Sequence, residues 1–246
     1  MKKAGVTIFL LCMVLMTHAA EKLFLLVEDG FHEFLKNDFH RLALSLSRKY
    51  DCKLAAVPEK GVAPVLKISK QKESENYNSV LFAVRGYLLF ANAGNPVGNL
   101  SRAEFKQLME GSMIRWSKPA VKIRQICYYG SEKTVPPLNK DSVPWVRFSE
   151  PPLTLQMVSL DSTAIGILPL TEAVLKVKGT KPLTVDGIAA TPQTVMDGTY
   201  PASERYYLSI RKDAPREVWN LYNKLRSKQT KLKLIKAGIL PAIKGD

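Results

Sequence analysis

Asn95-Pro96-Val97-Gly98-Asn99-Leu100-Ser101 opens the stretch of sequence that decides the fold of this 246-residue chain. Ser101 is a good helix N-cap, and Glu104 stands three residues further on, which is the spacing of a capping box. Gly111 is a natural helix terminator because glycine tolerates a left-handed backbone. We therefore expect a helix that begins after Ser101 and ends at Gly111.

Apolar runs of strand length alternate with helical repeats on both sides of this helix. Asp213 is expected to cap the first of two C-terminal helices, with Pro215 in its first turn. The alternation predicts an α/β protein with a mainly parallel sheet. Strands are expected at 23–27, 52–57, 79–84, 87–91, 123–129, 164–168, 183–185 and 205–211; helices at 32–50, 62–68, 153–160, 171–178 and within 213–237; and mainly loop at 70–78 and 135–149.

Several short motifs, in a fixed order, resemble the phosphate-binding proteins of ABC transporters, which belong to the type II periplasmic binding protein superfamily. The resemblance runs from Leu88 to Pro241. It begins with the quoted stretch and the Glu104, Phe105, Leu108, Gly111 and Trp116 that follow it. It continues with Ala164-Ile165-Gly166-Ile167, Val185-Asp186-Gly187-Ile188, Thr191-Pro192, Thr194-Val195, Gly198-Thr199-Tyr200-Pro201, Tyr206-Tyr207-Leu208 and Lys236-Ala237-Gly238-Ile239-Leu240-Pro241.

The resemblance implies a type II periplasmic-binding fold, in which two α/β lobes are joined by two crossing strands. We expect the crossings at 87–92 and 205–212. The first lobe would then comprise 21–91 plus 206–246, and the second lobe 92–205. Clefts between lobes are where small ligands usually bind.

The N-terminus has the pattern of a signal peptide. Lys2 and Lys3 precede an apolar run from Val6 to Met16, and small residues follow at Ala19-Ala20. The run is too short to span a bilayer, which takes ~20 residues. We expect residues 1–20 to be cleaved, so that the mature chain begins near Glu21 and is periplasmic or secreted.

The charge balance favours an anionic partner. The chain carries 36 Lys and Arg against 22 Asp and Glu, a net charge of +14. Its basic residues are scattered and form no stripe with aromatic residues, so nucleic acid is not an expected partner. The densest basic run, Lys224 to Lys233, is interpreted as the solvated face of an amphipathic helix.

The sequence carries none of the motifs that would indicate an enzyme. It has no Gly-x-Ser-x-Gly, no phosphate-cradling glycine loop and no dinucleotide fingerprint, so neither catalysis nor a cofactor is expected. His32 and His40 are not at the i, i+4 spacing that places two ligands together on a helix, which argues against a metal site. Cys52 and Cys127 fall in different expected lobes, and a disulfide between them would lock the hinge, so both are predicted to be free.

The resemblance places the anion site in two loops. Gly30 and Phe31, at the start of the first helix, would offer backbone N–H groups. The second loop would offer donors from Gly130, Ser131, Lys133 and Thr134. Both loops depart from the family pattern: Asp29 and Glu132 introduce carboxylates, and Cys127 stands near the position of the family's arginine. We therefore expect micromolar affinity for phosphate at best, about 8 kcal/mol.

Two functions remain open at this point. One is an exported solute-binding protein, expected to be monomeric, that captures phosphate or a related small oxyanion for an inner-membrane ABC permease. The other is a stand-alone periplasmic binding or adaptor module of the same fold, which has lost high-affinity phosphate binding and contacts another envelope protein. Fold alone does not decide between them.

Overall fold

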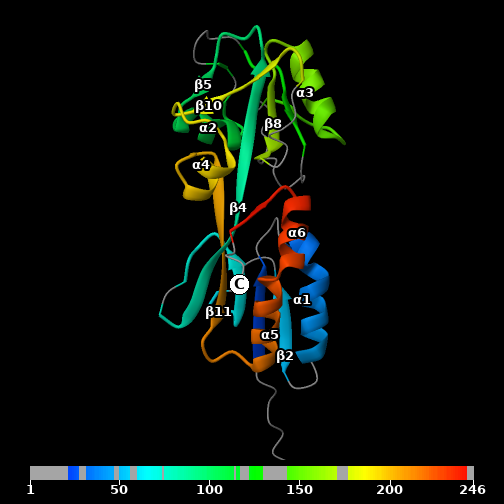
Figure 1. Ribbon diagram of the computed structural model, residues 1–246, viewed down its shortest axis with the longest axis vertical. Coiled ribbons are helices and arrows are strands. Elements are labelled where there is room, and N and C mark those ends of the chain that lie inside the picture. Colours follow the sequence, from blue (N-terminus) through cyan, green and yellow to red (C-terminus); the bar gives the residue numbers. More distant parts are fainter. Residues whose placement is uncertain are drawn as a thin grey trace, which may run out of the picture.

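The computed structural model describes residues 22–27, 32–46, 50–55, 60–73, 75–113, 115–116, 122–129, 143–170 and 177–242. The expected signal peptide, residues 1–20, lies outside these ranges. Figure 1 shows one long strand, β4 (Tyr77–Asn92), running through the molecule, with α1, α5 and α6 gathered toward one end and α2 and α3 toward the other. The remaining elements are β1 (Lys22–Val27), α1 (His32–Leu46), β2 (Asp51–Ala55), β3 (Leu66–Ser69), β5 (Asn99–Leu100), α2 (Arg102–Met109), β6 (Ile126–Tyr128), β7 (Trp145–Arg147), α3 (Pro151–Leu160), β8 (Ile165–Pro169), β9 (Thr180–Pro182), β10 (Thr184–Val185), α4 (Pro192–Asp197), β11 (Ser203–Arg211), α5 (Arg216–Leu225), α6 (Lys228–Lys236) and β12 (Leu240–Pro241).

The main sheet is parallel at its two ends and antiparallel in its middle. Its strands follow the order β2-β1-β3-β11-β4-β8-β6-β7, and β9 and β12 also pair with β4. β1 is parallel to β2 and β3, and β6 is parallel to β7 and β8. β11 is antiparallel to both β3 and β4, and β4 is antiparallel to β8. The fold is therefore mixed α/β, and the expected parallel pairing holds only in the two outer parts of the sheet.

Two large hydrophobic clusters form the core of the molecule. One gathers buried residues from 23–83 and 206–239, and the other gathers buried residues from 84–202. The neighbours Ala83 and Val84 on β4 belong to different clusters. β4 and β11 are thus the strands that pass from one cluster to the other. We call the place where they do so the junction.

Two of the expected strand and helix positions are corrected by the structure. The strands expected at 79–84 and 87–91 are one strand, because Ser203 and Glu204 of β11 pair with Gly86 and Arg85 between them. The short helix expected at 62–68 is wrong, since Leu66–Ser69 is a strand held between β1 and β11. β7 lies inside the expected 135–149 loop, where it pairs with β6.

The predicted helix ends depend on local chemistry. Ser101 and Glu104 form the predicted capping box of α2, and Gly111 follows with a φ of 73°. The prediction for α5 is wrong: Pro215 is its N-cap, and the carboxylate of Asp213 instead accepts a hydrogen bond from Arg211 Nε. Among the described helices, none combines the length and the hydropathy that a membrane crossing requires.

Candidate functional site

The carboxyl ends of the parallel strands face each other across the junction. Because β11 is antiparallel to both β3 and β4, the strands β1, β2 and β3 run in the same direction as β4, toward the second cluster. β8 is antiparallel to β4, so β6, β7 and β8 run the opposite way, toward the first cluster. Ligands of open α/β sheets bind outside the carboxyl ends of the strands. The topology therefore makes the junction the candidate functional site.

All six predicted ligand-binding residues lie outside the described residues. The described chain stops at Val27, the last residue of β1, and resumes at His32, the first residue of α1. It stops again at Tyr129, just after β6. Both strands end at the junction, but any contact between the two predicted loops stays a prediction. The six residues are Gly30, Phe31, Gly130, Ser131, Lys133 and Thr134.

The described part of the junction holds a polar cluster built around one carboxylate, that of Glu204. Lys70 directly follows β3, while Arg85 and Tyr87 come from β4. Glu204 and Tyr206 come from β11, with Glu204 paired directly to Arg85 in the strand register. Residues two apart on a strand point to the same face, which explains why these side chains meet. We call these five residues the Glu204 cluster.

Three hydrogen-bond donors and one further cation surround the carboxylate of Glu204. Its Oε2 accepts hydrogen bonds from the hydroxyls of Tyr206, at 2.8 Å, and Tyr87, at 3.1 Å. Arg85 Nη1 lies 3.7 Å from the same oxygen. Lys70 Nζ donates to Oε1 in a short contact. The two cations also lie over the ring of Tyr206, at 5.8 Å for Lys70 Nζ and 5.7 Å for Arg85 Cζ, within the range of cation–π attraction.

The electrostatics of the cluster keep its acid ionised and its phenols protonated. Burial alone would raise the pKa of Glu204, but the hydrogen bond and charge of Lys70, with help from Tyr206 and Arg85, lower it below its usual value. Burial and the negative charge of Glu204 raise the pKa of Tyr87 to about 12. Burial likewise raises the pKa of Tyr206. Near neutral pH the cluster therefore contains two cations, one anion and two neutral O–H donors.

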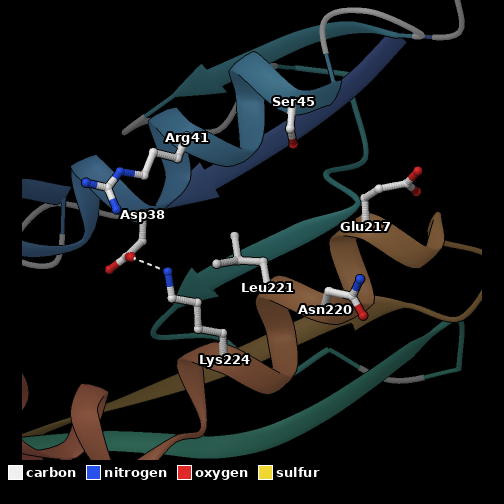
Figure 2. Close-up of a pocket in the computed structure, with 7 residues that line it drawn as sticks. All are labelled: Asp38, Arg41, Ser45, Glu217, Asn220, Leu221 and Lys224. Atoms are coloured by element: carbon white, nitrogen blue, oxygen red, sulfur yellow. Dashed lines mark hydrogen bonds and ion pairs between the residues drawn. The ribbon is translucent and has the colours of Figure 1, made fainter.

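A second concave site lies between α1 and α5 (Figure 2). It is a groove of about 320 Å³, and one of its walls carries the ion pair between Asp38 and Lys224, at 2.9 Å. Asp38 also accepts a hydrogen bond from Lys233 of α6, at 2.8 Å. Asp38 thus connects α1 to α5 and α6, and its ion pairs at the wall of the groove help to hold these helices together. Its lining residues are Asp38, Arg41, Ser45, Glu217, Asn220, Leu221 and Lys224.

The described residues include no group of three or more His, Cys, Asp or Glu side chains placed to hold a metal ion. Cys52 and Cys127 are both free thiols, as predicted from their positions in the sequence. Burial raises the pKa of Cys127 to about 12, so this thiol is protonated near neutral pH. A protonated, buried thiol is a poor nucleophile.

Solved structures share this architecture. A possible phosphate binding protein from Planctomyces limnophilus DSM 3776 superposes with a TM-score of 0.62 and 14% identity, over 90% of this chain and 93% of that chain. An ABC-type phosphate transport receptor from Vibrio cholerae gives 0.58 and 15%, over 89% and 99%. PstS from Borrelia burgdorferi gives 0.58 and 13%, over 90% and 98%. This chain has the type II periplasmic-binding fold.

The sequence motifs implied a type II periplasmic-binding fold, and the likeness to these solved structures confirms it. No protein-family model matches the chain, and no curated protein sequence matches it either. The identities to the solved structures are low, so the likeness shows the fold and leaves the ligand to be argued from the chain's own residues.

Sequence reasoning did not single out Lys70, Arg85 or Glu204. Arg85 did carry a signal, because it is the only charged residue in the apolar run from Val80 to Ala91. A charge in a buried strand requires a partner. The partner could not be read from the sequence, because Glu204 comes from a strand far along the chain.

Proposed function

We propose that this chain is an exported solute-binding protein that captures phosphate or a related small oxyanion at the junction. One observation supports the proposal most directly. The carboxyl ends of β1, β2 and β3 face those of β6, β7 and β8 at the junction, where Lys70 and Arg85 supply two positive charges. Arginine and lysine are the side chains that recognise oxyanions. The net charge of +14 would attract such a ligand over longer distances.

Residues outside the described ranges complete the proposed site. Gly30 and Phe31 would donate backbone N–H groups from the start of α1, and helix N-termini favour anions. Gly130, Ser131, Lys133 and Thr134 would supply further donors from the chain that follows β6. We also propose that residues 21–91 plus 206–246 and residues 92–205 are the two lobes that enclose the ligand.

Calorimetry with inorganic phosphate at low salt tests this function. We expect the unaltered mature chain to bind with micromolar affinity at best, about 8 kcal/mol, because Asp29 and Glu132 repel an anion. Glu132→Gly should tighten binding, since it removes one of these charges. Ser131→Ala should weaken binding, since it removes a donor. Nanomolar affinity of the unaltered chain would contradict the weak site, and no binding by any of the three proteins would contradict phosphate capture.

Export and the transport partner are further parts of the proposal. The short apolar run and the small residues at Ala19-Ala20 support cleavage before Glu21. Sequencing the N-terminus of exported protein should find Glu21 or a residue near it. Retention of Met1 on a membrane-bound product would contradict cleavage. The proposed partner is an inner-membrane ABC permease.

One observation favours the adaptor alternative. Glu132 and Cys127 stand near positions that the family uses to grip phosphate, and neither side chain can do so. If the protein fails to bind phosphate, a role as an adaptor that contacts another envelope protein becomes the better candidate.

A further inference from the structure

We propose that the Glu204 cluster is itself an anion-binding site, and that the carboxylate of Glu204 occupies it as a built-in anion when no ligand is bound. This inference rests on the proposed function, because it places a second group of ligand contacts at the same junction. The ligand class that fits is a small inorganic oxyanion such as phosphate.

The donors of the cluster form the set that an oxyanion requires. A guanidinium, an ammonium and two phenolic O–H groups converge on the two oxygens of a single carboxylate. Charged donors and O–H donors of this kind give the short, strong hydrogen bonds by which proteins hold carboxylates and phosphates. A free oxyanion in the place of the Glu204 carboxyl group would meet the same three hydrogen-bond donors and the same guanidinium.

The two cations of the Glu204 cluster favour an anion that carries more charge than one carboxylate. Lys70 and Arg85 contribute two positive charges, and Glu204 contributes one negative charge. The two phenols add none near neutral pH, because their pKa values are raised. A doubly charged oxyanion would therefore be attracted to these two cations more strongly than the single charge of Glu204 is.

The Glu204 cluster is accessible enough to solvent for a free oxyanion to replace the carboxylate of Glu204. The side chain of Lys70 is 54% exposed and that of Glu204 is 25% exposed, while Arg85 is 19% exposed. Water and small ions can therefore reach the carboxylate. The three torsions of a glutamate side chain allow its carboxyl group to withdraw while β11 keeps its pairing.

The Glu204 cluster contacts both hydrophobic clusters of the core, so replacement of the Glu204 carboxylate by a free oxyanion would change contacts to both. Tyr206 belongs to the first cluster and Tyr87 to the second, and both donate to Glu204 Oε2. An incoming oxyanion must displace this bridging carboxylate. Displacement costs part of the binding free energy, so Glu204 is a second reason to expect weak affinity.

Glu204→Gln tests the inference, with inorganic phosphate as the probe in calorimetry at low salt and neutral pH. Glutamine keeps an acceptor for the two hydroxyls and removes the charge, so we expect affinity to rise at least about tenfold. Asp213→Asn is the matched control, because it changes the net charge equally on an exposed side chain just beyond β11. The control should bind as the unaltered chain does. Lys70→Met, added to Glu204→Gln, should abolish the gain.

The outcomes separate this inference from the proposed function. If the unaltered chain binds phosphate and Glu204→Gln binds it no better than Asp213→Asn does, the built-in anion is refuted and the proposed function stands. If only Glu204→Gln binds, the inference holds and phosphate capture by the native chain fails. If no protein binds, both fail.

Thermal unfolding should show first that Glu204→Gln is folded. If it is not, Glu204→Asp gives the second measurement, because it draws the carboxylate back by one methylene. If the inference is right, Glu204→Asp raises phosphate affinity by a smaller factor than the removal of the charge in Glu204→Gln is expected to do. An unchanged affinity in a folded Glu204→Asp protein would overturn the inference.

Discussion

Tyr200 donates its phenolic hydrogen to the backbone carbonyl of Tyr87, with 2.9 Å between the two oxygens. The N–H of Tyr87 donates to the carbonyl of Ala202 at 3.1 Å, on the same side of β4. β11 begins only at Ser203, so these two bonds extend the contact with β4 to residues that precede the first residue of β11. Burial raises the pKa of Tyr200, which keeps its hydroxyl a donor.

Tyr200→Phe should therefore lower the free energy of unfolding by about 1–2 kcal/mol, because a buried carbonyl loses its hydrogen bond. Urea denaturation measures the change. Tyr207→Phe is the control, since it removes a hydroxyl for which the described residues provide no hydrogen-bond partner. An equal loss in both variants would mean that the bond to Tyr87 contributes nothing.

Gly198→Ala should destabilise the protein through two effects. Gly198 has a φ of 83°, which disfavours any residue with a Cβ, and an added Cβ would lie 2.5 Å from Arg205 Nη2. Arg205 Nη2 donates to the carbonyl of Met196 at 2.9 Å, so it cannot move away without losing that bond. The expected loss is about 1–3 kcal/mol in the free energy of unfolding.

Gly187→Ala separates the two effects. Gly187 has a similar φ of 76°, but nothing lies within 4 Å of its added Cβ. Its loss of stability should be about 1 kcal/mol, from the backbone alone. If Gly187→Ala cost as much as Gly198→Ala, contact with Arg205 would not matter.

Asp38→Asn should weaken the protein near neutral pH and have little effect in acid. Burial alone would raise the pKa of Asp38, but the hydrogen bonds and charges of Lys233 and Lys224 lower it below its usual value. The ion pairs therefore stabilise the fold above the unfolded pKa of about 4 and lose this effect as the pH falls through the lower, folded value.

The expected difference near neutral pH is about 1 kcal/mol, because both lysines are about half exposed and solvent screens them. Denaturation of the variant and the unaltered chain across the acid range measures it. Asp213→Asn, whose carboxylate is 71% exposed, should show a smaller difference near neutral pH. A difference for Asp38→Asn that grew in acid would contradict the sign derived above.

The two thiols should differ in reactivity in the native protein. Cys127 is fully buried with a raised pKa, so a thiol reagent should not label it before unfolding. Cys52 is partly exposed and should react slowly, because burial also raises its pKa. Peptide mapping of the mature chain should find label on both residues after unfolding without reductant. Unlabelled cysteines at that stage would indicate a disulfide.

The sequence by itself determined the elements whose causes are local. The capping box of α2 joins Ser101 to Glu104, and the glycines at 111 and 238 end helices through their positive φ. These hydrogen bonds and backbone preferences act over three or four residues, so a short window of sequence contains all of the participants. The order of the motifs was also enough to imply the type II periplasmic-binding fold.

Only the tertiary structure decided the features whose participants are distant in the chain. Leu66–Ser69 is a strand because β1 and β11 bond to it on either side, although its short apolar run also suits a helix. β4 continues through Arg85-Gly86 because Ser203 and Glu204 pair there. The Glu204 cluster exists for the same reason: a carboxylate on β11 is held by groups on β4 and beyond β3, and no local pattern specifies pairing at that separation.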